Sequence, residues 1–196
     1  MVQRLKTLPV IGVELLDRKA LRSVESRKGI PGVIKSFPDG ITALLVETAA
    51  DTVEELTANI GTVLESIRDF TPWLPISFTD KESEYSVFWN IRAGIFPSIG
   101  AMRPAGSTCI IEDVAFHLKD LPEATAALQM VLEKHGYTDA AIYGHALEGN
   151  FHFILNQSFD SQKEVARYEA LMNDVITLVV DTYDGSLKAE HGTGRN

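Results

Sequence analysis

Cysteine is almost absent from the sequence, and no long hydrophobic run occurs in it. The 196 residues include one cysteine, Cys109, so no disulfide can form within the chain, which is typical of a reducing compartment. The longest apolar runs, such as residues 41–46 and 175–180, are far shorter than the ~20 residues that span a bilayer. The N-terminal residues also lack the apolar core of a secretory signal. We therefore expect a cytoplasmic protein without a transmembrane segment.

Basic residues are outnumbered by acidic ones. Lys and Arg total 18 against 27 Asp and Glu, which gives a formal net charge of −9, and no Lys/Arg cluster stands out. An acidic surface of this kind repels the phosphate backbone of nucleic acids. Nucleic acid is therefore excluded as an expected partner.

What the sequence does contain is typical of a globular domain. Hydrophobic residues make up 45% and charged residues 23% of the chain. The predicted helices are residues 17–26, 52–67, 80–93, 122–135 and 161–183, and the predicted strands are residues 41–47, 73–78, 109–118, 140–146 and 151–157. This order predicts an α+β fold, ferredoxin-like in character, with a mostly antiparallel sheet and helices packed on one face.

Two regions of the chain fall outside this regular pattern. Residues 27–40 are rich in Gly and Pro, which favours a loop or a domain boundary. We therefore interpret residues 1–40 as a lead-in segment with a short helix, and residues 41–196 as the domain. The polar, Gly-rich end of the chain is typical of a turn that leads into another element. We accordingly expect the chain to be a fragment of a longer protein.

The most informative segment is the predicted hairpin at residues 140–157. A four-residue turn at residues 147–150 would place His145 opposite His152 on the neighbouring strand. In that register the apolar side chains lie on one face of the hairpin and both histidines lie on the other. Opposed side chains have Cβ atoms about 4.5–5.5 Å apart, so the two imidazoles can share one divalent metal.

Residues elsewhere in the sequence can complete such a metal site. Glu190 offers a carboxylate ligand, and the imidazole of the neighbouring His191 can act as a general base. Arg92, on a predicted helix, can bind a substrate carboxylate through its forked guanidinium. The same residues also fit structural roles, because paired histidines are common on exposed sheets and a lone helical arginine is more often a salt-bridge partner.

Four short motifs occur together and resemble those of one protein family. In chain order they are Trp89-Asn90-Ile91-Arg92, Glu112-Asp113-Val114, Gly144-His145 with Gly149-Asn150-Phe151-His152, and Gly185-Ser186 with Glu190-His191-Gly192-Thr193-Gly194. Together they resemble the C-terminal, substrate-side domain of FAD-linked oxidases, the D-lactate, glycolate and D-2-hydroxyglutarate dehydrogenase group of the vanillyl-alcohol oxidase superfamily. The resemblance covers about residues 41–196.

The resemblance implies a flavoenzyme that oxidises a D-2-hydroxy acid and passes a hydride to FAD. An FAD-binding domain would lie upstream in the same parent chain, and an iron–sulfur region would lie downstream, as in some long members. His145, His152 and Glu190 match positions that hold a divalent metal, often zinc. His191 matches the proposed base that takes the hydroxyl proton.

Two further roles follow from the resemblance, and three positions depart from the family pattern. Arg92 matches a contact to the substrate carboxylate, and Asn150 would lie on the flavin side of the pocket. Leu147-Glu148 stands where the family usually has Gly-Asp, and Ile154 stands where hydroxyglutarate-binding relatives often have Asn. The lysine of those relatives has no clear match, so Arg103 is the candidate substrate-binding replacement. D-2-hydroxyglutarate and D-lactate both stay open as substrates.

A flavin dehydrogenase also needs an electron acceptor. A quinone, a cytochrome or an electron-transfer flavoprotein would serve, and a membrane-bound acceptor would place the enzyme peripherally at the membrane. Without the flavin domain we expect the chain to be inactive. Two alternatives remain: a stand-alone metal-dependent hydrolase that uses the same metal ligands, and a non-catalytic ferredoxin-like binding or dimerisation module.

Overall fold

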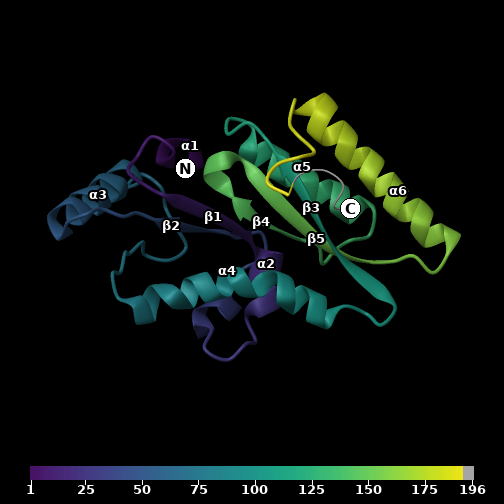
Figure 1. The fold of residues 1–196 in the computed structure, drawn as a ribbon, viewed down its shortest axis with the longest axis horizontal. Helices are drawn as coiled ribbons and strands as arrows, with labels where there is room; N and C mark the ends of the chain where they lie inside the picture. The colour runs from purple at the N-terminus through teal and green to yellow at the C-terminus, as the bar shows by residue number, and fades with distance from the viewer. Residues whose placement is uncertain (192–196) are drawn as a thin grey trace.

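A five-stranded antiparallel sheet organises the chain in the computed structural model, which describes residues 1–191 (Figure 1). The strands are β1 Gly12–Asp17, β2 Thr42–Glu47, β3 Ser107–Ala115, β4 Ala141–His145 and β5 Asn150–Ser158, in the spatial order β2-β1-β4-β5-β3. The helices are α1 Val2–Leu5, α2 Arg18–Val24, α3 Val53–Ser66, α4 Glu82–Met102, α5 Leu121–Lys134 and α6 Gln162–Ile176, with short turns η1 Gly32–Ser36 and η2 Ala146–Glu148 and a π-helical turn η3 Thr177–Thr182. The predicted α+β class and antiparallel sheet are confirmed.

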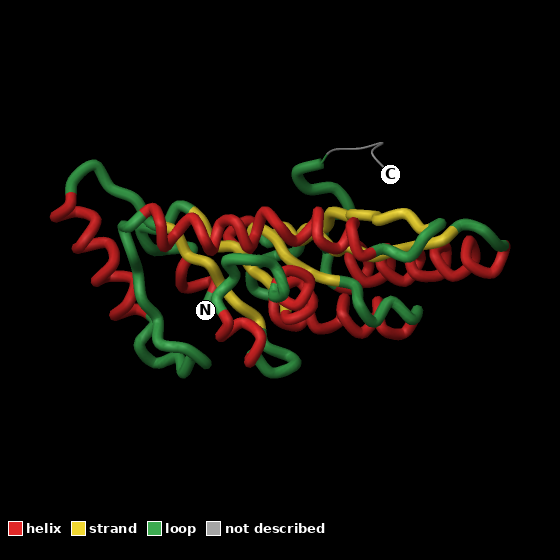
Figure 2. Tube along the Cα trace, turned by 90° about the horizontal axis from the view of Figure 1, so that it is seen from below, coloured by secondary structure: helices red, strands yellow, loops and turns green. Residues whose placement is uncertain are grey.

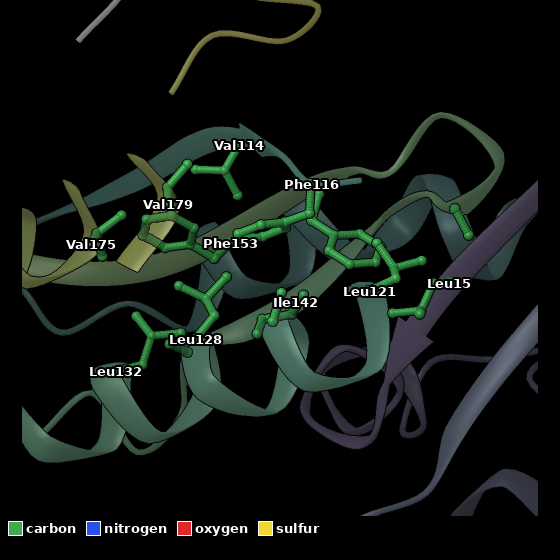
Figure 3. Close-up of a cluster of buried hydrophobic side chains, with 14 of the residues drawn as sticks. Leu15, Val114, Phe116, Leu121, Leu128, Leu132, Ile142, Phe153, Val175 and Val179 are labelled. Atoms are coloured by element: carbon green, nitrogen blue, oxygen red, sulfur yellow. The ribbon is translucent and has the colours of Figure 1, made fainter. Parts of the chain in front are cut away.

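Helices cover both faces of this sheet. On one face, Leu15, Ile142 and Phe153 pack in a core with α5 and α6, as Figure 3 shows. On the other face, Leu16 and Tyr143 pack in a second core with α2 and α4. The expectation of helices on one face is therefore corrected in this detail. The central strands carry apolar side chains on both sides, so each face needs its own helical layer.

Strand β1 belongs to the interior of the sheet, between β2 and β4. The sequence pattern predicts a lead-in segment without a strand at residues 1–40, and this prediction is wrong for β1. In the structure Val13 and Leu15 contribute to one core and Leu16 to the other. A strand buried on both faces has no strict alternation of polar and apolar residues, which is why the period of two was not visible.

The β4–β5 hairpin has a register that differs by two residues from the predicted one. Its loop is residues 146–149 and ends at Gly149, whose φ of 65° is left-handed. His145 consequently pairs with Asn150, and Tyr143 pairs with His152. A shift by two residues leaves each side chain on its predicted face. The two histidines therefore share a face, but they lie diagonally across the strands rather than directly opposite.

Helix α4 is longer than predicted, because it continues through Pro97 instead of ending near Ala93. Both of these residues are exposed, so water can satisfy the Ala93 carbonyl that the proline leaves without a donor. The buried side chains of Ile95 and Ile99 pack on the sheet on the other side of the helix. Their burial offsets the local cost of the proline and keeps the helix on the sheet.

The remaining predictions have mixed outcomes. The helix expected after Asp17 forms, with the Asp17 side chain accepting a hydrogen bond from the Ala20 N–H at 2.7 Å. The helix expected at residues 161–183 forms as α6 and η3. The strand expected at residues 73–78 is wrong, since that segment is an irregular loop in the structure.

Candidate metal centre and active site

His145 and His152 lie together at one end of the sheet, on the face that α4 covers. The hairpin brings their ring centroids to 5.5 Å, with the ring planes at 88°. His152 is buried, and His145 is partly exposed. The sheet therefore brings together the two predicted imidazole ligands, which are diagonal neighbours rather than directly opposite each other.

Glu190 completes this group from the segment that follows α6. Its Oε1 lies 3.0 Å from His152 Nε2, and its Oε2 lies 3.2 Å from His145 Nε2. The ligand atoms of the three side chains all lie within 4.8 Å of one another. In Figure 2 the described loop that leads toward the C-terminus leaves the strands on the side opposite the helices drawn below them.

Glu14 on β1 contacts the Nδ1 side of the His145 ring, and none of the sequence motifs includes this residue. Its Oε1 lies 2.6 Å from His145 Nδ1, which favours a proton on that nitrogen, so that in the neutral ring Nε2 is the atom with the lone pair. The hydrogen bond to Glu14 raises the pKa of His145. Burial works to raise the pKa of Glu14, but hydrogen bonds from His145 and Arg92 outweigh it and lower that pKa. A single acid inside the apolar run Val13–Leu16 was the available signal.

Asp113 on β3 has a comparable place beside His152. Its Oδ1 lies 3.2 Å from His152 Nδ1, without the alignment of a hydrogen bond. Its Oδ2 accepts backbone N–H groups from Ala189 at 3.2 Å and from His191 at 3.0 Å. Burial works to raise the pKa of Asp113, but the hydrogen bonds from His191 and the Asn150 amide hold that pKa below its usual range. Asp113 therefore fixes the segment that carries Glu190.

The two remaining histidine features concern protonation and stacking. Burial lowers the pKa of His152, which favours the neutral ring that binds metals. The His191 ring stacks on the His152 ring, with centroids 4.9 Å apart and planes at 7°. His191 Nε2 lies 3.5 Å from Glu190 Oε1. The Gly192–Gly194 part of the motif lies outside the described residues.

Arg92 reaches the cluster from the middle of α4. Its Nε donates to Glu14 Oε2 at 2.8 Å, and its Nη2 lies 3.4 Å from His145 Nε2. The guanidinium also lies over the Tyr143 ring, 5.0 Å from its centroid. The predicted carboxylate-binding arginine thus lies beside the histidines. A substrate that contacts both the arginine and the histidines would require this arrangement.

Arg103 and Asn150 are not placed in the same way. Arg103 caps the C-terminal end of α4, where its Nη1 donates to the Gly100 carbonyl. At 1.5 Å per residue, about 16 Å of helix separates it from Arg92. Asn150 is buried, and its amide nitrogen donates to Asp113 at 2.5 Å and to the Val114 carbonyl at 3.1 Å. The structure therefore assigns the Asn150 amide a contact within this domain.

The residues present fit a divalent metal. Two imidazole nitrogens and one carboxylate are a common zinc donor set. The carboxylates of Glu14, Asp113 and Glu190 face the guanidinium of Arg92 and the histidines, which leaves an excess of two negative charges that a divalent cation would neutralise. The hydrogen bond between Glu14 and His145 Nδ1 also matches the carboxylate partner that metal-binding imidazoles usually have.

Comparison with known proteins shows the family of this chain. A protein-family model described as FAD linked oxidases, C-terminal domain, matches residues 1–196. The chain is 26% identical over 189 residues to the glycolate oxidase subunit GlcD of Escherichia coli K12, which covers 94% of this chain and 35% of that relative. It is 25% identical over 191 residues to the D-2-hydroxyglutarate dehydrogenase of Stutzerimonas stutzeri, which covers 95% of this chain and 39% of that relative. The chain thus spans well under half the length of these relatives.

Among residues 1–191, no helix combines the length and the apolar character needed to cross a membrane.

Proposed function

Because the chain belongs to the family of FAD linked oxidases, C-terminal domain, we propose that it is the substrate-side domain of a flavin-dependent D-2-hydroxyacid dehydrogenase. The reaction removes a hydride from C2 and a proton from the hydroxyl group, and it yields the 2-oxo acid. FAD, held by a flavin-binding domain outside this chain, would accept the hydride. The observation that carries the proposal is the convergence of His145, His152 and Glu190 beside Arg92.

Each residue of the cluster has a role that its geometry supports. Arg92 binds the substrate carboxylate through the guanidinium edge that Glu14 leaves free. His145, His152 and Glu190 would hold the divalent metal, which when bound supplies a Lewis acid that lowers the pKa of the substrate hydroxyl group. The carboxylate and hydroxyl of a 2-hydroxy acid sit on adjacent carbons, so the two binding groups must also be neighbours.

His191 is the residue that we propose as the general base. Its backbone is fixed by Asp113 and its ring by stacking on His152. The Nε2 atom lies next to Glu190, on the side where the substrate hydroxyl would be bound. A neutral imidazole at this position can take the hydroxyl proton while the hydride leaves C2.

The cations near the cluster favour a substrate with one carboxylate. D-2-hydroxyglutarate carries a second carboxylate, for which Arg103 was the sequence-based candidate. Because Arg103 lies at the far end of α4 from Arg92, we favour D-lactate over D-2-hydroxyglutarate.

The test is anaerobic reduction of the flavin in a protein that joins this chain to a flavin-binding domain. We expect loss of the oxidised flavin absorbance with D-lactate and not with L-lactate, and loss of that response in His191→Ala or after metal chelation. Reduction by the L-isomer alone, or full activity of His191→Ala, would contradict the proposal. Ester hydrolysis by the chain alone, without flavin, would instead favour the metal-dependent hydrolase.

A further inference from the structure

Glu14 contacts the candidate metal ligand His145 and the candidate carboxylate-binding Arg92 at the same time. We infer that Glu14 is a positioning residue that couples the metal ligand His145 to the carboxylate-binding Arg92. The inference rests on the proposed function, because it assigns Glu14 a role toward the metal and the substrate carboxylate of that site.

The geometry of the coupling is set by the sheet. Glu14 lies directly opposite His145 in the β1–β4 register, so the backbone itself holds the two side chains together. The Glu14 side chain is 7% exposed. Each of its oxygens has one partner: Oε1 is 2.6 Å from His145 Nδ1, and Oε2 is 2.8 Å from Arg92 Nε. Both oxygens of the Glu14 carboxylate are thus engaged within the cluster.

The bond to His145 determines what that ring can bind. With the proton held on Nδ1 by a carboxylate, the lone pair is on Nε2, the atom that points toward Glu190 and His152. Loss of such a partner typically weakens metal binding about 10- to 100-fold, because the ring is free to change tautomer and orientation.

The bond to Arg92 determines where the guanidinium lies. Arg92 comes from α4, which packs on the sheet as a separate layer, whereas Glu14 is part of the sheet. With Nε held, Nη2 lies beside the cluster, 3.4 Å from His145 Nε2. The Glu14 carboxylate thus sets the distance between Arg92, which would bind the substrate carboxylate, and His145, which would hold the metal.

The experiment uses the 196-residue chain, with Co²⁺ as a spectroscopic metal probe and D-lactate as the ligand. The main variant is Glu14→Gln. The matched control is Asp17→Asn, which changes a buried acid on the same strand that contacts neither His145 nor Arg92 among its hydrogen bonds. Circular dichroism and thermal unfolding establish that each variant is folded.

The inference predicts effects on both ligands in Glu14→Gln. We expect the Co²⁺ dissociation constant to rise about 10- to 100-fold, with altered visible absorption bands, and D-lactate binding at saturating Co²⁺ to weaken at least roughly tenfold. Asp17→Asn should change either constant less than about twofold. Arg92→Ala should lose D-lactate binding while it keeps Co²⁺ affinity within about threefold, since the His145–Glu14 bond remains.

Each outcome bears on a distinct statement. Folded Glu14→Gln with unchanged Co²⁺ and D-lactate binding overturns the inference and leaves the proposed function intact. A wild-type chain that binds no Co²⁺ overturns the metal centre and the inference together. If Glu14→Gln does not fold, Glu14→Asp serves instead: it keeps the charge but is one methylene too short to reach both partners, so full affinity for both ligands in that variant also overturns the inference.

Discussion

At the scale of single residues, the candidate site depends on buried carboxylates that bind backbone and imidazole groups. Asp113 is the clearest example, because its Oδ2 accepts two backbone N–H groups of the segment that carries Glu190 and His191. Its Oδ1 receives the Asn150 amide and lies beside His152. Ser186 of the same segment pairs with Ala115 on β3, and Asp113 binds the two amides on either side of Glu190.

Replacement of Asp113 should therefore release the segment. In Asp113→Ala we expect amide hydrogen exchange at Ala189 and His191 to accelerate at least roughly tenfold, because a hydrogen bond to a charged group contributes about 1.5–3 kcal/mol. Hydrogen exchange followed by mass spectrometry measures it. Asp174→Asn, which changes a partly exposed acid on α6, is the control and should leave these amides unaffected. Unchanged protection in Asp113→Ala would contradict the assignment.

At the scale of secondary-structure elements, the N-terminus of α2 contains a buried acid, Asp17, whose charged form is disfavoured by burial. Burial is the main reason that the pKa of Asp17 is raised, and it outweighs the hydrogen bond from the Ala20 N–H. A raised pKa in the folded state means that the folded state binds the proton more readily than the unfolded one. Stability from this group is therefore present below the unfolded pKa of about 3.9 and is lost as pH rises through the folded value.

The variant Asp17→Asn tests this sign. Asn is as good an N-cap as Asp, so the bond from Ala20 is kept while the buried charge is removed. We expect the variant to be at least as stable as the wild type at pH 7, with an advantage that shrinks as pH falls toward about 4. Urea unfolding at a series of pH values measures it. A variant that gains on the wild type as pH falls would show that the sign is wrong.

The β4–β5 loop is the element that sets the histidine pair. Gly149 has a φ of 65°, and a Cβ there would meet the Phe116 carbonyl oxygen at 2.0 Å. Gly149→Ala should cost at least about 2 kcal/mol in unfolding free energy and weaken Co²⁺ binding, because the loop must move. Gly61→Ala on α3, where nothing lies within 4 Å, is the matched control and should stabilise the chain by about 0.5–1 kcal/mol. Equal effects at the two glycines would refute the role of the loop.

At the scale of the whole molecule, the sequence predicted the elements with strong local signals. The capped, amphipathic helices and the His-containing hairpin are examples, because their periodicity is visible within about a dozen residues. The site residues His145, His152, Glu190 and Arg92 also lie together, as their motifs implied.

What the sequence did not predict depends on long-range packing. Glu14 lies on a strand buried on both faces, and its importance arises only from pairing with His145, which is 131 residues away. The extension of α4 beyond Pro97 depends on the sheet that its isoleucines cover. The hairpin register depends on the contact of Gly149 with Phe116, whose N–H donates to the Gly149 carbonyl at 2.9 Å. None of these contacts produces a recognisable pattern in the local sequence.

The whole molecule should also respond to metal as a single unit, because the ligands join two parts of the chain that are distant in sequence: the β4–β5 hairpin and the segment after α6. A ligand that binds only the folded state stabilises it by about 2.7 kcal/mol at a concentration of 100 times Kd. For a domain of this size that corresponds to a rise in Tm of roughly 5–11 °C. We expect Zn²⁺ to produce such a rise in the wild type, a chelator to reverse it, and His152→Ala to abolish it. His135→Ala, which changes a histidine paired with Asp174 outside the cluster, should keep it. An equal rise in His152→Ala would show that Zn²⁺ binds elsewhere, and no rise in the wild type would show that the cluster does not hold the metal in this chain.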